Sequence, residues 1–164
     1  MTTPPLPLDL IDALQMRYFD ALDGKDMYAW LGTFSEADDT SYVLNTFDNE
    51  NADLPLALML DDCRARLEDR VTYIREIWAG TFEDYRTRHF AQRIACTSAG
   101  EADTYNLRSN FSVFFTSDAD GQSRVLACGE YRDVIRIEAG EARFVSRKAL
   151  CDTTILPQYL VYPV

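Results

Sequence analysis

The segment from Arg88 to Leu156 alternates between apolar and polar positions in four runs separated by short acidic turns. In the second run the apolar residues occupy odd positions, and they are Tyr105, Leu107, Phe111, Val113 and Phe115. In the third run one face carries Val125, Ala127, Tyr131, Ile135 and Ile137, and the other carries Arg124, Glu130, Arg132 and Arg136. A period of two is typical of β-strands, so the pattern predicts a sheet with one apolar and one charged face.

The predicted turns lie at residues 98–101, 118–121 and 139–140. Each contains a glycine, which can adopt the positive φ angle that a tight hairpin requires. Three successive hairpins make an antiparallel meander, and the segments able to cover its apolar face come earlier in the chain. Because helices are predicted first and the sheet follows, the expected fold class is α+β.

Two helices are predicted near the start of the chain. Asp9 is expected to cap the first helix, and Gly24 ends it. Its apolar side recurs at helical spacing and comprises Leu10, Ile11, Leu14, Tyr18, Phe19 and Leu22, while Asp12, Gln15, Arg17 and Asp20 are expected to face away. Asp26 is expected to cap a second, shorter helix that ends near Gly32.

Residues 62–78 predict the longest helix, which is expected to cover the apolar side of the sheet. Its apolar stripe consists of Cys63, Leu67, Val71, Ile74 and Trp78. Short strands are predicted at 41–47 and 56–60. Between them, residues 48–53 are acidic but lack the glycine and ligand order of an EF-hand, so a solvated loop is expected.

Length and charge narrow the possible classes of protein. The 164 residues predict an arm at 1–8 and a single domain at 9–164. The formal net charge of −11 argues against nucleic acid and anionic membranes as partners, because both are negatively charged and bind basic protein surfaces. No apolar stretch approaches the ~20 residues of a membrane span, and the N-terminus lacks the features of a secretory signal. The expected location is cytoplasmic.

Residues that could bind metal are few and scattered. Cys63, Cys96, Cys128 and Cys151 form no C-x-x-C pair, so we expect reduced, mostly buried thiols. His89 is the one histidine. A Rieske cluster needs two histidines and two cysteines, and the usual iron facial triad needs two histidines and a carboxylate. Neither site can be built from this chain alone.

Two surfaces could serve either the fold or a partner. Basic side chains expected on the charged face of the sheet are Arg93, Arg108, Arg132, Arg136, Arg147 and Lys148. Such a face can be a protein interface or an ordinary solvated surface. Residues 156–164 are almost wholly apolar. Either this tail folds back onto its own sheet or another chain covers it.

Several short motifs are similar, in order and spacing, to those of one family. They are Ala21-Leu22-Asp23 followed by Tyr28, Trp30 and Leu31; Tyr42; Leu67-Glu68-Asp69-Arg70-Val71; Arg88-His89; Ser109-Asn110-Phe111; Gly129-Glu130-Tyr131-Arg132-Asp133; and Arg147 through Asp152. From about Leu10 onward, the chain resembles the small (β) subunit of the Rieske-type aromatic-ring-hydroxylating dioxygenases. It looks closest to members that act on aromatic carboxylates such as anthranilate, benzoate or salicylate.

The resemblance implies a fold, partners and cofactors. The fold would be a curved antiparallel or mixed sheet forming a cone-shaped barrel closed by N-terminal helices, cystatin-like or SnoaL-like, as in scytalone dehydratase and nuclear transport factor. The partners would be a large (α) oxygenase subunit, usually in an α3β3 heterohexamer, and other copies of this chain, with electrons from NADH through a reductase or ferredoxin. The large subunit would carry a Rieske [2Fe–2S] cluster and mononuclear Fe(II). This chain would hold no cofactor, no metal and no catalytic residue.

The sequence alone is also compatible with two other functions. A free-standing cone-fold dehydratase or isomerase would use His89 as general base, beside a carboxylate such as Asp133 and a tyrosine such as Tyr131 in a pocket. A binding module would use the same pocket without chemistry. Because a strand histidine is more often a hydrogen-bonded structural group, we favour the non-catalytic subunit.

Overall fold

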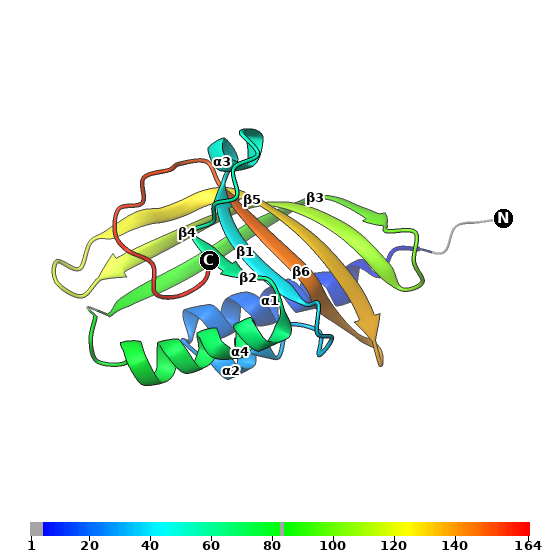
Figure 1. Ribbon diagram of the computed structural model, residues 1–164, viewed down its shortest axis with the longest axis horizontal. Helices are drawn as coiled ribbons and strands as arrows, with labels where there is room; N and C mark the ends of the chain where they lie inside the picture. The colour runs from blue at the N-terminus through cyan, green and yellow to red at the C-terminus, as the bar shows by residue number, and fades with distance from the viewer. Residues whose placement is uncertain (1–4, 83) are drawn as a thin grey trace.

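The computed structural model describes residues 5–82 and 84–164. Its elements in chain order are α1 (Leu8–Asp23), α2 (Met27–Leu31), β1 (Ser41–Thr46), α3 (Phe47–Asn51), β2 (Met59–Asp61), α4 (Arg64–Thr72), the π-helix η1 (Tyr73–Trp78), β3 (Tyr85–Ser98), β4 (Thr104–Ser117), β5 (Ser123–Glu138) and β6 (Glu141–Cys151). The strands form a curved layer whose one side is covered by α1, α2 and α4, with α3 on the other side (Figure 1). The predicted α+β class is confirmed.

The six strands are ordered β2-β1-β6-β5-β4-β3. Strands β3 to β6 form the predicted antiparallel meander, and β1 pairs with β6 in parallel, so the sheet is mixed. Within the described residues β2 and β3 remain edges, so the sheet is not closed into the barrel that the resemblance implied. Closure would require β2 to pair with β3, and β2 has only 3 residues against 14 in β3. The observed fold is an open, curved sheet that wraps around α1.

Two β-bulges reverse the alternation predicted for the long strands. In β5, Leu126 has no partner on β4, because Val113 pairs with Ala127 and Phe114 pairs with Val125. Val125 is therefore 48% exposed on the outer face, while Leu126 is buried. In β6 the pairing skips Val145. A bulge adds one residue to a strand, so the side chains beyond it change face. The predictions that Val125 faces the core and that Arg147 lies on the charged face are therefore wrong.

The N-terminal helices form close to their predicted positions. Helix α1 begins at Leu8 with Pro7 at the N-cap position, so Asp9 lies in the first turn and does not cap the helix. Residues 1–4 of the predicted arm lie outside the described residues. The side chain of Asp26 caps α2 as predicted, because its Oδ1 accepts a hydrogen bond from the Ala29 N–H at 2.9 Å. Gln15 is buried, contrary to the prediction that it faces away from the core.

Three segments between Phe47 and Trp78 differ from their predictions. The predicted loop at 48–53 begins with helix α3, because Thr46 caps it and acidic residues occupy its first turn. The predicted strand at 56–60 is shortened to Met59–Asp61. The predicted helix 62–78 is helical but divides into α4 and the π-helix η1. No helix in the described part of the chain is long and apolar enough to cross a membrane.

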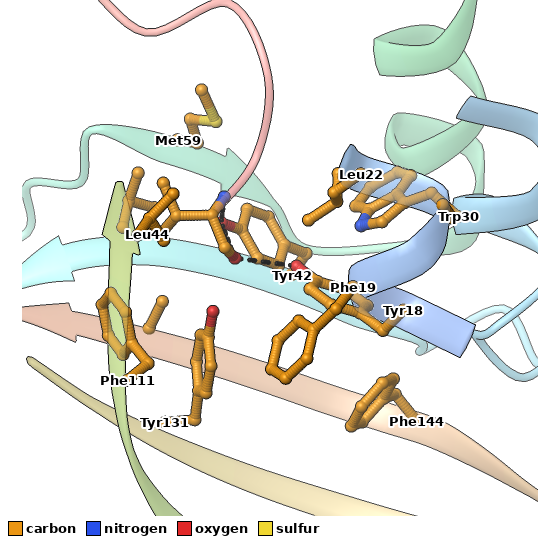
Figure 2. Packing of buried hydrophobic residues seen from close by; sticks show 14 of the residues in the cluster. Tyr18, Phe19, Leu22, Trp30, Tyr42, Leu44, Met59, Phe111, Tyr131 and Phe144 are labelled. Atoms are coloured by element: carbon orange, nitrogen blue, oxygen red, sulfur yellow. Dashed lines mark hydrogen bonds between the residues drawn. The ribbon is translucent and has the colours of Figure 1, made fainter. Parts of the chain in front are cut away.

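The apolar tail folds back into the core of the same chain. Val161 and Val164 are buried, although Tyr159 remains exposed. The hydroxyl groups of Tyr18 and Tyr42 donate hydrogen bonds to the Val164 carbonyl oxygen at 2.9 and 3.3 Å, and the Val164 N–H donates to the Tyr42 hydroxyl at 3.0 Å. Figure 2 shows these hydroxyl groups meeting the tail above the inner face of the sheet. The fold-back alternative is therefore confirmed for the end of the chain.

Candidate functional site

His89, the one candidate general base, lies on β3 against α1. Its side chain is 2% exposed, and its Nδ1 lies 2.6 Å from Oδ1 of Asp23 at the end of α1. The backbone N–H of His89 also donates to Oδ2 of Asp23 at 3.2 Å. On one side the imidazole stacks on Phe19, with ring centroids 5.7 Å apart and planes 14° from parallel. His89 therefore fastens the end of α1 to the edge strand β3.

The electrostatics of this pair favour a neutral imidazole. Burial lowers the pKa of His89, and the hydrogen bond to Asp23 offsets only part of this effect. Burial alone would raise the pKa of Asp23, but the hydrogen bonds from His89 outweigh it, so the pKa of Asp23 is lowered. The neutral imidazole donates from Nδ1, so Nε2 carries the lone pair that a general base would use. That nitrogen is buried without a hydrogen-bond partner among the described residues.

The predicted partners of His89 lie elsewhere in the sheet. In the strand register, His89 is opposite Val113, and Val113 is opposite Ala127. Asp133 is six residues further along β5, or about 20 Å at the usual rise of a strand. The carboxylate beside His89 is therefore Asp23, and the predicted grouping of His89 with Asp133 is wrong.

Asp133 instead binds Arg147, its direct neighbour on β6. The Nε and Nη2 atoms of Arg147 donate to the two carboxylate oxygens of Asp133 at 3.0 and 2.9 Å, and both side chains are 0% exposed. Nη2 also donates to Gln15 Oε1 at 2.5 Å. The guanidinium carbon lies 4.2, 4.0 and 4.1 Å from the ring centroids of Tyr18, Tyr131 and Phe144. A buried cation is thus enclosed by one carboxylate, one amide and three aromatic faces.

This buried cluster is held in its charged form by its geometry. Burial lowers the pKa of the Arg147 guanidinium, but Asp133 more than offsets this, so the pKa is raised. Burial raises the pKa of Asp133, with Arg147 opposing it. Two parallel N–H···O contacts are the geometry of a guanidinium with an ionised carboxylate. The cluster joins α1, β5 and β6, while Arg147 Nη1 and the Tyr131 hydroxyl have no hydrogen-bond partner among the described residues.

The space between α1 and the sheet is filled by side chains. Phe111 stacks on Tyr131 with ring centroids 4.3 Å apart, and Phe19 lies beside Tyr131 (Figure 2). Phe19 also stacks on His89. A cavity bordered by Gln15, Phe19 and Leu107 has a volume of only about 50 Å³. Pockets for small molecules usually measure about 300–1,000 Å³. This cavity is therefore several-fold smaller than the usual pocket for a small molecule.

The outer face of the sheet carries a network of ion pairs. Glu130 accepts hydrogen bonds from Arg108 at 3.1 Å and from Arg132 at 2.8 Å. Glu50 of α3 accepts two from Lys148, at 3.0 and 3.2 Å. Beside this network an open groove of about 350 Å³ runs across β3, β4 and β5. The predicted charged face is therefore present, although Arg147 and Arg93 do not belong to it. Arg93 is opposite the buried Ser109 in the register and binds Asp12 of α1, so it lies on the inner side of the sheet.

Potential metal ligands are dispersed in the described residues. No group of three or more histidine, cysteine, aspartate or glutamate side chains is placed to hold a metal ion in this part of the chain. The four cysteines are free thiols; Cys151 is buried and the other three are half-buried. The thiols are thus less buried than the sequence predicted.

The sequence contained signals for part of the buried cluster. Asp133 occupies an odd position in the run 125–137, on its apolar face. Gln15 follows Ile11 by four residues, within the buried stripe of α1. The inward position of Arg147 depends on the bulge at Val145, which alternation alone does not reveal.

Comparisons with known proteins agree with this architecture. The family model described as "Ring hydroxylating beta subunit" matches residues 18–158. Terephthalate 1,2-dioxygenase, terminal oxygenase component subunit beta 2, from Comamonas sp. is 27% identical over 154 residues, covering 94% of this chain and 96% of the relative. The crystal structure of the β subunit of a proposed aromatic-ring-hydroxylating dioxygenase from Novosphingobium aromaticivorans DSM 12444 has a TM-score of 0.80 and 28% identity, covering 93% of each chain.

A further solved structure supports the fold. The β subunit of benzoate 1,2-dioxygenase from Burkholderia mallei ATCC 23344 has a TM-score of 0.70 and 22% identity, covering 96% of this chain and 100% of that one. The family match includes β3, β5, β6 and the end of α1 from Tyr18, and thus the His89–Asp23 and Arg147–Asp133 pairs, whereas Gln15 lies before it. Because that match spans most of the sequence, this chain belongs to the ring hydroxylating β subunit family.

Proposed function

We propose that the chain is the non-catalytic small subunit of the terminal oxygenase component of an aromatic-ring-hydroxylating dioxygenase. The observation that carries the proposal is the filled interior. His89, Asp133 and Arg147 are the groups that could do chemistry there, and each is bound to a neighbour in the core. Their contacts join α1 to β3, β5 and β6, so they stabilise the scaffold.

The proposed partner is a large subunit that carries the Rieske [2Fe–2S] cluster and mononuclear iron. One histidine cannot complete either donor set, so the metals would belong to that partner. The proposed assembly is a cytoplasmic α3β3 hexamer that receives electrons from NADH through a reductase or ferredoxin. Nucleic acid and membranes are not proposed as partners.

The proposed substrates are aromatic carboxylates. The names of two similar proteins support this class, because terephthalate and benzoate are both aromatic carboxylates. Binding of the substrate would take place in the large subunit, because the proposed iron centre lies there.

Co-expression with the large subunit encoded nearest to this chain tests the proposal. We expect an affinity-tagged large subunit to retain the small chain, and the complex to contain iron and to oxidise benzoate or terephthalate when a reductase and NADH are supplied. The small chain purified alone is expected to do neither. Iron bound by the isolated chain, or ring oxidation by it, would contradict the proposal.

A His89→Ala variant of the complex separates this proposal from an acid–base enzyme. We expect turnover within roughly tenfold of wild type, since loss of a general base would cost about 10²–10⁴-fold. An Asp23→Asn variant is the matched control, because it weakens the same contact without removing the imidazole. A large loss in His89→Ala alone, with the complex intact, would favour the enzyme hypothesis.

A further inference from the structure

Two groups of exposed apolar side chains lie on opposite halves of the sheet. The first, here called the leucine edge, comprises Leu54, Leu56, Leu58 and Leu60, which are 46, 58, 44 and 48% exposed. The second, here called the aromatic face, comprises Phe90, Phe114 and Val125, which are 58, 39 and 48% exposed. The fold described above uses neither group in its core.

The leucine edge ends in the edge strand β2, because Leu60 belongs to this strand and the other three leucines precede it. Strand β2 pairs with β1 and with no other described strand, so its other side has no strand partner within the described residues. Its inward residues, Met59 and Asp61, are buried, whereas Leu60 points outward. Residues 54–60 contain no charged side chain. Exposed edge strands usually carry charges that prevent pairing with another chain, so an apolar edge indicates a binding surface.

The aromatic face spans the outer side of β3, β4 and β5. Phe90 and Phe114 contact each other edge to face, with ring centroids 5.8 Å apart. Val125 is the direct neighbour of Phe114 on β5. It points outward because of the bulge at Leu126, so the bulge completes the aromatic face.

Some charges beside the two groups lack an ion-pair partner among the described residues, and these differ in sign between the groups. Arg88 is exposed next to Phe114 in the register, and its guanidinium contacts only the Thr87 carbonyl oxygen among the described residues. Asp48 and Asp53 are exposed just before the leucine edge and have no basic partner in the part of the chain that the structure describes. The leucine edge therefore matches the aromatic face in both apolar character and charge.

We propose that the leucine edge of one copy of this chain docks on the aromatic face of a second copy. The proposal rests on the small-subunit function proposed above, in which several copies meet in one assembly. Because the two groups are different surfaces on opposite halves of the sheet, the contact is head to tail, and each copy keeps one group of each kind for its next neighbour. Contacts of this kind close into rings when the rotation allows. A symmetric contact between two leucine edges would leave every aromatic face exposed.

Site-directed cross-linking in the assembled oxygenase tests the contact. Leu56→Cys and Phe114→Cys variants are each assembled with the large subunit, alone and as an equimolar mixture, and treated with a short bismaleimide. We expect the cross-linked dimer of small chains only in the mixture, above the background given by the native cysteines of the wild-type chain. A dimer formed by Leu56→Cys alone, or a product joining Leu56→Cys to the large subunit, would overturn the proposal.

Substitutions that introduce charge give an independent measurement. We expect Leu56→Asp and Phe114→Asp each to weaken association between small chains at least about tenfold in sedimentation equilibrium, as for central interface residues. Ile155→Asp is the control, because Ile155 is 81% exposed outside both groups and should leave association unchanged. Equal effects of all three variants would overturn the proposal. An iron-containing complex without the cross-link would refute the head-to-tail contact only, whereas failure to form that complex would contradict the proposed function.

Discussion

The buried pair of Arg147 and Asp133 allows a quantitative test of how the interior is stabilised. An Asp133→Asn substitution keeps the shape of the side chain but removes the negative charge. An Arg147→Met substitution keeps most of the length but removes the positive charge. The double variant replaces both charges at once. All three can be compared with wild type by urea unfolding of the purified chain.

The expected magnitudes follow from burial and geometry. Both side chains are 0% exposed and share two hydrogen bonds, so each single variant leaves a charge in the core without its partner. Such a loss costs about 3–5 kcal/mol of unfolding free energy. Asp133→Asn should lie at the lower end, because Gln15 and three aromatic faces still contact the guanidinium. The double variant should lose less than either single variant, because it leaves no unpaired charge in the core.

An exposed pair with the same bidentate geometry provides the control. Arg93 donates to both carboxylate oxygens of Asp12 at 3.1 Å, but their side chains are 34 and 48% exposed. An Arg93→Met variant is expected to cost at most about 1 kcal/mol. If Asp133→Asn cost no more than this control, or if the double variant lost the sum of the two single effects, the account of the buried pair would be refuted.

Three further predictions concern separate parts of the core. Because burial lowers the pKa of His89, the unfolded chain binds a proton below about pH 6.5 that the folded chain does not, so the unfolding free energy should fall as the pH drops from 7.5 to 5.5. His89→Gln should remove this component in pH-dependent urea titrations; an identical slope in the variant would contradict it. Gly129→Ala should cost about 3 kcal/mol or more, because its Cβ would lie 1.9 Å from the Leu150 carbonyl oxygen; thermal unfolding close to wild type would contradict this expectation. Tyr42→Phe should cost about 2 kcal/mol, because it leaves the buried Val164 N–H without its acceptor. Its unfolding curve should move accordingly, and an unchanged curve would show that the tail contact contributes nothing.

The positions of the elements could be predicted because their signals are local. The turn glycines Gly100, Gly121 and Gly140 have φ angles of 91, 67 and 84°, as the predicted hairpins require. The alternation in β4 held throughout, because that strand has no extra residue of its own in either pairing. Helix α2 was located by Asp26, whose capping contact involves a residue only three positions away.

The faces of side chains were harder to predict, because they depend on pairing between strands. One extra residue in β5 turns Val125 outward, and one in β6 turns Arg147 inward. Neither bulge contains a glycine that would mark it in the sequence. The partner of His89 was also missed, because Asp23 is 66 residues away and meets His89 only when α1 packs on β3.

The buried pair and the bulge in β6 depend on each other. Asp133 and Arg147 face each other only in the register with one extra residue at Val145. Without that extra residue Arg147 would point outward, and the carboxylate of Asp133 would remain buried without a cation. We therefore expect the pair to select this register even though it adds little net stability. The same register places Arg132 opposite Lys148 on the outer face, where both reach Glu50. An ion pair inside the domain thus fixes the arrangement of charges that the domain offers to its partners.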